Sequence, residues 1–210
     1  MLVVDYGMGN LKSVARALET CGASVSLVAR PTRLGRNHIL VLPGVGAFPA
    51  AMKRLQTSGL DLWIHEAFAN GAWLLGICLG MQLCLDLGEE LETTKGLGLL
   101  PGKVEKIPST AASGVSLKLP HIGWAGIDWP KAKPLPPLFS GIPPGTDFYF
   151  VHSFAASPLR PSDELAFCTY GGHRIPAVLG KDRIYGCQFH PEKSGAAGLR
   201  LLKNFIEEAS

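Results

Sequence analysis

The stretch WLLGICLGMQLC, Trp73–Cys84, places a cysteine between two glycines where one apolar pattern gives way to another. Before Cys78 the residues are continuously apolar, as in a strand covered on both faces, and after it they follow helical spacing. G-x-C-x-G at such a junction is the cysteine form of the nucleophile elbow, a sharp turn between strand and helix. Residues two positions away pass too close to tolerate a Cβ, which Gly76 and Gly80 lack. We therefore predict that Cys78 is a nucleophile, with a buried structural cysteine as the alternative.

Outward from this elbow, the first half of the chain alternates strand-like and helix-like patterns. Glycines close most of the helix-like segments, as expected at helix C-termini. Strands are predicted at 2–7, 24–30, 38–44 and 72–77, and helices at 10–22 (capped by Asn10), 49–59, 61–71 and 79–88. This alternation predicts an α/β fold, an open and mostly parallel sheet with helices on both faces.

The texture changes from about Leu97, where short strands are separated by turns rich in proline and glycine. The pattern is typical of antiparallel hairpins, so the complete sheet is predicted to be mixed. Strands are predicted within 97–107, 123–129, 146–156, 164–170 and 183–190, and a final helix at 198–210. The proline-rich segment 130–144 is predicted to be a surface connection, and residues 1–210 a single domain.

Composition excludes several classes of protein. Apolar residues make up 47% of the 210 residues and charged residues 18%, so the chain can bury a sizeable core. The net charge of +3, with no run of basic residues, argues against nucleic acid as a ligand. No signal peptide and no apolar run of roughly 18 residues is visible, which argues against a membrane. Five cysteines without CxxC spacing predict reduced thiols in the cytoplasm, and no motif indicates a cofactor or a metal.

A thiol nucleophile generally needs a histidine as its base, and the chain has six. His190 ends the apolar stretch IYGCQF, and Pro191 cannot continue a strand, so we expect His190 at a strand terminus. Glu192 can turn back to orient the imidazole, the third role in a catalytic triad. His152 is the alternative base. We predict structural roles for His38 and His65, and packing roles for Cys21, Cys84, Cys168 and Cys187, and assign none to His121 and His173.

The turn LPGVGAF, residues 42–48, follows a buried strand and opens a helix. It lacks the spacing of a dinucleotide fingerprint and the lysine of a phosphate loop. Its backbone N–H groups suit one half of an oxyanion hole, with the N–H of Leu79 as the other half. An ordinary glycine-rich turn is an equally good interpretation.

GICLG at 76–80 together with HPE at 190–192 resembles the class I (triad) glutamine amidotransferases. Within them, the sequence is most similar to the glutaminase subunits of imidazole glycerol phosphate synthases. The motifs that carry this likeness are DYGMGNLKSV at 5–14, LPGVGAF, GICLGMQLC, HIGW at 121–124, YFVHSF at 149–154 and HPEKSG at 190–195. They extend over nearly the whole chain.

The resemblance implies a glutaminase in which Cys78 attacks the carboxamide of L-glutamine and forms a thioester. His190 would take the thiol proton and later activate water, and Glu192 would orient His190. The remaining roles that it implies are glutamine binding by Gly46, Gln82, Glu90, Ser153 and Phe154, oxyanion N–H groups from Val45 and Leu79, and partner contacts by Asn10 and Lys193. The partner would be a cyclase subunit with a (β/α)8 barrel that forms a heterodimer with this chain.

Two positions depart from the pattern of this branch. Ala125 stands where relatives usually have asparagine, and Phe154 where tyrosine is common, so details of the partner contact or pocket could differ. Three alternatives stay open: a glutaminase subunit for anthranilate, carbamoyl phosphate or purine synthesis, a stand-alone cysteine hydrolase, and a non-catalytic scaffold. An intact Cys78, His190 and Glu192 argues against the scaffold.

Overall fold

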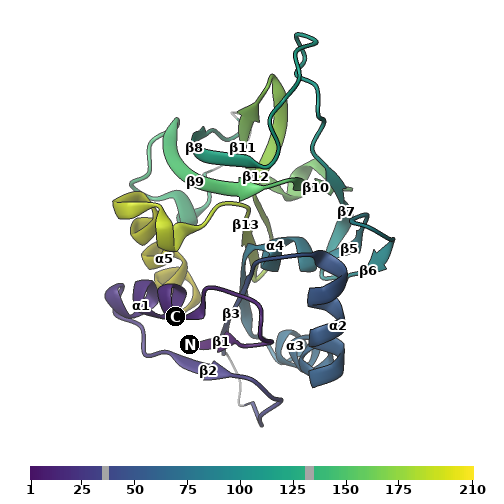
Figure 1. Ribbon diagram of the computed structural model, residues 1–210. Coiled ribbons are helices and arrows are strands. Elements are labelled where there is room, and N and C mark those ends of the chain that lie inside the picture. Colours follow the sequence, from purple (N-terminus) through teal and green to yellow (C-terminus); the bar gives the residue numbers. More distant parts are fainter. Residues whose placement is uncertain (35–37, 131–134) are drawn as a thin grey trace.

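A computed structural model describes residues 1–34, 38–130 and 135–210, and its centre is a seven-stranded mixed sheet (Figure 1). Five strands run parallel and two continue the sheet antiparallel. The order across the sheet is β11 (Glu164–Tyr170), β12 (His173–Lys181), β13 (Ile184–Cys187), β4 (Trp73–Cys78), β3 (Ile39–Gly44), β1 (Leu2–Val4) and β2 (Ser26–Val28). The predicted α/β fold with a mostly parallel sheet is confirmed.

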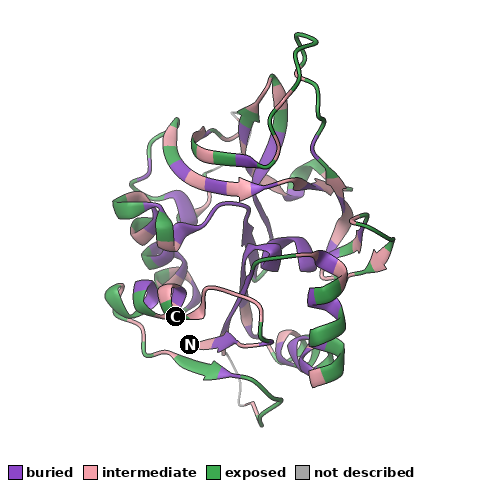
Figure 2. Cartoon of the chain, viewed as in Figure 1, coloured by how far each residue is buried: buried purple, intermediate pink, exposed green. Residues whose placement is uncertain are grey.

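Helices cover both faces of this sheet, as the alternating pattern predicted (Figure 1). On one face, α1 (Leu11–Thr20) and α5 (Gly195–Ala209) contribute residues such as Leu18 and Phe205 to one core cluster. On the other face, α2 (Phe48–Ser58) and α3 (Leu60–Ala69) contribute to a second cluster. Figure 2 shows that the buried residues are concentrated along the central strands and the inward faces of the helices. The near-continuous apolar runs of β3 and β4 follow from this double cover.

The second half of the chain adds two smaller sheets beside the central one. One has the order β10 (Phe154–Pro158), β7 (Leu100–Lys106), β5 (Leu85–Gly88) and β6 (Thr94–Lys95), and the other pairs β8 (His121–Ile127) with β9 (Thr146–His152). Short 3₁₀ helices lie at η1 (Pro137–Phe139), η2 (Pro161–Asp163) and η3 (Pro191–Lys193). The predicted antiparallel hairpins are therefore present, and β9 and β10 are separated only by Ser153.

The predicted helix at 79–88 is wrong in its second half. The helix α4 spans only Leu79–Leu83, and Leu85–Gly88 forms β5 instead. The sequence Leu-Asp-Leu-Gly fits both an alternating and a helical pattern over so short a window. Pairing with β7 and the close packing of Phe48 on Gly88 decide in favour of the strand.

The segment 130–144, predicted as a surface connection, is partly core. Leu138 and Phe139 are fully buried, and the Asn204 amide of α5 donates hydrogen bonds to the carbonyls of Leu138 and Ser140, at 2.9 and 2.8 Å. A distant helix thus anchors this segment, which its proline content did not reveal. Residues 131–134 of the prediction lie outside the described part of the chain.

The register of the parallel strands brings three chain segments together at one edge of the sheet. Gly44 of β3 lies opposite Cys78 of β4, and Cys187 of β13 lies opposite Ile77. The turn after β3, the elbow after β4 and the segment that leads from β13 to His190 therefore leave the sheet side by side. Ligands of open α/β sheets bind at this carboxyl edge. No helix among the described residues has the length and apolar character needed to cross a membrane.

Candidate active site

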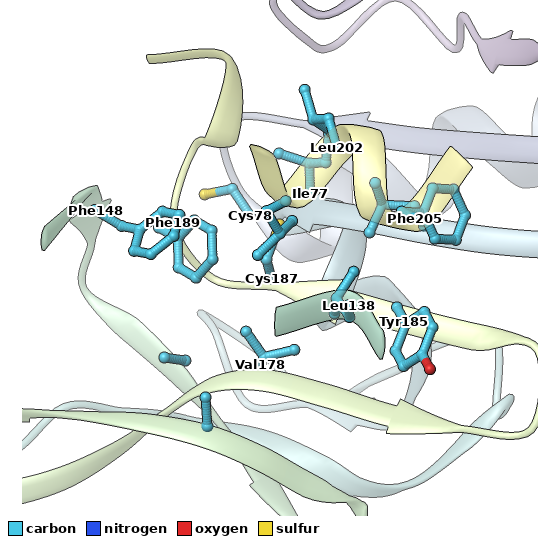
Figure 3. Packing of buried hydrophobic residues seen from close by; sticks show 14 of the residues in the cluster. Ile77, Cys78, Leu138, Phe148, Val178, Tyr185, Cys187, Phe189, Leu202 and Phe205 are labelled. Carbon is cyan, nitrogen blue, oxygen red and sulfur yellow. The ribbon is translucent and has the colours of Figure 1, made fainter. Parts of the chain in front are cut away.

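Cys78 is in a strained backbone conformation between β4 and α4. Its φ of 55° lies in the left-handed region, which residues with a Cβ rarely adopt. Strain of this kind persists where the surrounding structure enforces it, and it is frequent at active sites. The side chain lies at the edge of a core cluster, and Figure 3 shows its sulfur directed away from Phe205. The predicted elbow is thus present in the structure.

The two glycines of the elbow are required by close backbone contacts. A Cβ on Gly80 would overlap the carbonyl oxygen of Leu42 in β3. A Cβ on Gly76 would lie 2.7 Å from backbone atoms of Gly80 and Met81. Both contacts are with backbone, which cannot rotate away as a side chain can, so only glycine fits at either position.

His190 and Glu192 form a buried hydrogen-bonded pair. The His190 Nδ1 lies 2.8 Å from the Glu192 Oε1, and both side chains are almost completely buried. The His190 backbone is also fixed, since its N–H donates to the Tyr149 carbonyl and its carbonyl accepts from the Ser194 hydroxyl. Strand β13 ends at Cys187, three residues before His190, so the prediction that His190 lies at a strand terminus is wrong by three residues.

The other ring nitrogen of His190 faces the thiol. Because Nδ1 is bound to Glu192, Nε2 is the ring nitrogen that is available to interact with Cys78. It forms no hydrogen bond with any described residue by the usual distance and angle criteria. Burial lowers the pKa of His190, but the interactions with Cys78 and Glu192 outweigh burial and raise the pKa to about 9. An imidazole with this pKa holds a proton at neutral pH and stabilises a neighbouring thiolate.

Cys78 and His190 open onto a pocket of about 310 Å³. Every residue predicted for glutamine binding or the oxyanion hole lines the same pocket, and Glu192 lies behind His190. The lining residues are Val45, Gly46, Cys78, Leu79, Gln82, Glu90, Pro120, Val151, His152, Ser153, Phe154 and His190. His152, the alternative base, also lines the pocket, whereas Pro120 and Val151 were not predicted there, because the segment before β8 and strand β9 reach the pocket only through the tertiary fold.

The turn after β3 lies directly against the elbow. An added Cβ on Gly44 would come within 2.9 Å of the Leu79 Cβ and 3.0 Å of the Gly80 N. Gly46 has a φ of 101°, open to glycine but strained for other residues, and Val45 is 42% exposed beside it. The N–H groups of Val45 and Leu79 therefore belong to two adjoining backbone segments at the mouth of the pocket.

Gln82 and Gln188 form a buried amide pair beneath the thiol. The Gln82 Nε2 donates to the Phe154 carbonyl and to the Gln188 Oε1, both at 2.9 Å. The Gln188 Nε2 in turn lies 3.8 Å from the Cys78 Sγ as a donor. The sequence analysis did not identify Gln188, although a glutamine inside the apolar stretch IYGCQF was a usable signal, because a buried amide needs partners.

Glu90 is held by the first turn of α2. Its Oε2 accepts a hydrogen bond of 2.7 Å from the N–H of Phe48. A carboxylate is favourable at a helix N-terminus, where backbone N–H groups are unpaired. The interaction places a negative charge in the wall of the pocket, where it can attract a positively charged group of a ligand.

His152, the alternative base, is unsuited to that role. Burial, with smaller contributions from His121 and His190, lowers its pKa to about 4 even though a hydrogen bond to the Phe154 carbonyl opposes the shift. Both of its ring nitrogens are occupied, Nδ1 by the Phe154 carbonyl at 2.8 Å and Nε2 by His121 Nδ1 at 3.1 Å. His190 is therefore the better base of the two.

Three of the other cysteines are fully buried away from the pocket. Burial raises the pKa of the thiols of Cys84 and Cys168 to about 12 and that of Cys187 well above its usual value. The Cys21 thiol is partly exposed and donates to the Leu199 carbonyl. These environments keep the four groups protonated at neutral pH, in keeping with the packing roles predicted for them.

The residues predicted to contact a partner lie outside the pocket. Asn10 is the N-cap residue of α1, as predicted, but its side chain forms no capping hydrogen bond, and its carbonyl accepts from the N–H of Val14. The Lys193 Nζ lies 5.8 Å from the ring centre of Tyr149. Tyr149 also packs against Trp124, which is 57% exposed. Ala125, in place of asparagine, is partly buried in β8 opposite Phe148.

Comparison with known proteins relates this geometry to one family. The family model for glutamine amidotransferase class-I matches residues 2–209. Imidazole glycerol phosphate synthase subunit HisH of Bacillus velezensis is 44% identical over 208 residues, 99% of this chain and 96% of the relative. The subunit of the same name from Geobacillus kaustophilus is 44% identical over 204 residues, 97% of this chain and 94% of the relative.

Solved structures support the same fold at lower identity. A crystal structure of a glutamine amidotransferase superposes with a TM-score of 0.73 at 20% identity, covering 99% of this chain and 98% of the other. The structure of PurLQS from Thermotoga maritima superposes with a TM-score of 0.72 at 19% identity, covering 100% and 98%.

Proposed function

This chain belongs to the class I glutamine amidotransferases, and we propose that it is the glutaminase subunit of an imidazole glycerol phosphate synthase, acting in histidine biosynthesis. The observation that carries the proposal is the 44% identity to HisH subunits over nearly the full length of both chains. Identity of that extent accompanies a pocket in which a strained cysteine faces a histidine paired with glutamate.

In the proposed reaction, the Cys78 sulfur attacks the carboxamide carbon of glutamine while His190 carries the thiol proton. The tetrahedral oxyanion is stabilised by the N–H groups of Val45 and Leu79. Collapse of the tetrahedral intermediate breaks the C–N bond, and His190 gives the proton to the departing nitrogen. Ammonia is released, and a glutamyl thioester remains on Cys78. Water, deprotonated by His190, attacks the thioester and releases glutamate and the thiol. Glu192 keeps the imidazole in the required tautomer through both steps.

The walls of the pocket suit the two ends of a glutamine molecule. The carboxylate of Glu90 can bind the α-ammonium group, and Gly46, Ser153 and Phe154 present backbone along the length of the ligand. Gln82 lies one helical turn beyond Cys78 and can contact the side of the substrate. A volume of about 310 Å³ is at the lower end of the range for small-molecule sites, in keeping with a single amino acid.

The proposed partner is a cyclase subunit with a (β/α)8 barrel, which would use the ammonia to make imidazole glycerol phosphate and an aminoimidazole carboxamide ribotide. We place the contact near Asn10 and Lys193. Lys193 lies over Tyr149, which packs against Trp124, and Trp124 and Ile122 of β8 are each 57% exposed. Ammonia released into water would be protonated and lost, so a sealed interface is required.

In this proposal, residues 1–210 form one amidotransferase domain. The five cysteines form no disulfide, in keeping with a location in the cytoplasm, where thiols stay reduced.

Co-purification with the host's cyclase and a glutaminase assay test this function. We expect a one-to-one complex whose glutamine hydrolysis rises when the nucleotide substrate of the cyclase is added. Association with an enzyme of anthranilate, carbamoyl phosphate or purine synthesis instead would overturn the assignment. Full hydrolysis without any partner would indicate a stand-alone hydrolase.

A further inference from the structure

A chain of buried histidines leads from β8 to the wall of the pocket. His121 and His152 lie opposite one another on β8 and β9, and both are almost completely buried. His121 is stacked between Phe150 and Tyr170, with ring centres 5.1 and 4.0 Å away. Two histidines that avoid solvent and take no part in the chemistry require another explanation.

The hydrogen bonds fix the tautomer of each ring. A carbonyl can only accept, so His152 must carry its proton on Nδ1, which faces the Phe154 oxygen at 2.8 Å. Its Nε2 is then an acceptor, and His121 must donate from Nδ1 across 3.1 Å. The low pKa of His152, about 4, keeps this arrangement unchanged across the neutral range.

The Phe154 carbonyl is the point where this histidine chain meets the amide pair. It accepts from His152 Nδ1 at 2.8 Å and from Gln82 Nε2 at 2.9 Å, which occupies both of its lone pairs. The neighbouring Ser153 carbonyl accepts from the N–H of Ile107. The break between β9 and β10 is therefore held by the last side chain of β9, His152, and by two groups from elsewhere in the chain, the Gln82 amide and the Ile107 N–H.

We propose that His121 and His152 are positioning residues, which fix the Ser153–Phe154 backbone as the wall against which glutamine binds. This inference rests on the proposed function, since it assigns the wall to the glutamine pocket. Because the Phe154 carbonyl already accepts two hydrogen bonds, it is not a free acceptor for glutamine, and residues 153–154 present a backbone of fixed conformation to the ligand. Without the His152 donor, the carbonyl keeps only the hydrogen bond from Gln82, and the pocket loses part of its preorganised form.

Three variants separate positioning from packing. His152→Leu removes the donor to Phe154, whereas His152→Asn retains an N–H at the place of Nδ1. His121→Phe keeps the stacking with Phe150 and Tyr170 but removes the hydrogen bond to His152. His173→Gln is the matched control, because His173 is a histidine of β12 whose Nε2 contacts only the Thr110 carbonyl among its described hydrogen bonds.

Binding is measured by calorimetry with glutamine on a Cys78→Ala background in complex with the cyclase, where no turnover occurs. We expect His152→Leu to weaken Kd at least tenfold. His121→Phe and His152→Asn, which both lose the hydrogen bond between the two histidines but keep a donor to Phe154, should weaken it about threefold, and His173→Gln should remain within twofold of the parent. In the active complex, His152→Leu should raise KM more than it lowers kcat. Thermal melting of each variant shows whether the fold is retained.

A Kd for His152→Leu within twofold of the parent would overturn the inference. An equal loss in His152→Leu and His152→Asn would also overturn it, because a merely structural histidine is not rescued by a matching donor. If the Cys78→Ala parent binds no glutamine and the wild-type complex hydrolyses none, the proposed function itself fails. If the parent binds glutamine, the proposed function stands, and an unchanged Kd in His152→Leu contradicts only the inference about the histidines.

Discussion

The backbone of the nucleophile elbow and the backbone of the opposite wall of the pocket are each held in place, but by different kinds of contact. Around Cys78, the constraints come from residues within two positions in the sequence and from the strand beside them. The wall at Ser153 and Phe154 is held by Gln82, His152 and Ile107, which belong to three separate segments. A local motif thus forms the elbow, whereas the surface that faces it is held by the neighbouring His152 side chain and by two groups distant in sequence, the Gln82 amide and the Ile107 N–H.

The largest effect should come from closing the space that the elbow needs. Gly80→Ala places a Cβ onto the Leu42 carbonyl, and the backbone on both sides would have to move. We expect a loss of at least about 4 kcal/mol in the free energy of unfolding, or no folded protein. Denaturant unfolding measures it. Gly9→Ala, whose Cβ would meet only ordinary contacts of 3.6 Å or more, is the control and should fold normally.

Removing the sulfur should abolish the reaction without affecting assembly. Cys78→Ala is expected to lower glutamine hydrolysis by about 10⁴-fold or more while the complex with the cyclase still forms, because the loss is chemical. Steady-state assays and size-exclusion chromatography measure the two properties. Turnover near the wild-type level would show that the elbow is not the site of attack.

The base and its orienting group should contribute unequally. His190→Ala removes proton transfer and should lower kcat by about 10⁴-fold, whereas Glu192→Gln keeps a hydrogen-bonding group beside Nδ1 and should cost about 10²-fold. Parallel measurements of kcat in the complex compare the two variants. Equal losses would contradict the assigned roles.

A smaller effect is expected from the amide pair that joins the elbow to the wall. Gln188→Leu removes the donor to Cys78 and the acceptor for Gln82, so both regions lose one contact. We expect kcat/KM to fall about tenfold, equal to about 1.4 kcal/mol. The isosteric change Gln188→Glu tests whether the donor matters, because it keeps the acceptor and removes the N–H that faces the thiol. An unchanged kcat/KM in both variants would exclude a role for this residue.

The smallest expected effect is a dependence of stability on pH. The pKa of His190 is raised to about 9 from an ordinary value near 6.5, so its contribution to stability is complete below pH 6.5 and is lost as the pH rises through 9. The difference in Tm between wild type and His190→Gln should narrow by a few degrees over this interval. When the same two proteins are compared on a Cys78→Ala background, which lacks the interaction with the thiol, the difference in Tm should narrow at lower pH. A gap that widens with pH would refute the raised pKa.

The fold was largely predictable where local pattern and burial agree. The helices after β1, β3 and Gly59, the buried strands β3 and β4 and the elbow itself follow from apolar spacing and glycine positions. The second half of the predicted helix at 79–88 was wrong, and the predicted surface position of 130–144 was wrong only for its buried residues, such as Leu138 and Phe139. In both, pairing with β7 or contact with α5 overrides a short or ambiguous pattern.

The sequence by itself determined the elbow around the proposed nucleophile, because a turn that tight leaves its signature in neighbouring residues, and it pointed to His190 and Glu192 through the proline that follows an apolar stretch. Only the tertiary structure distinguished His190, the proposed base, from His152, whose two ring nitrogens are both occupied. Hydrogen-bond partners and burial set the proton affinity of an imidazole, and the Nε2 of His152 is occupied by His121, which belongs to β8 and lies 31 residues away in the sequence. Such a role depends on distances through space, which spacing along the chain does not encode.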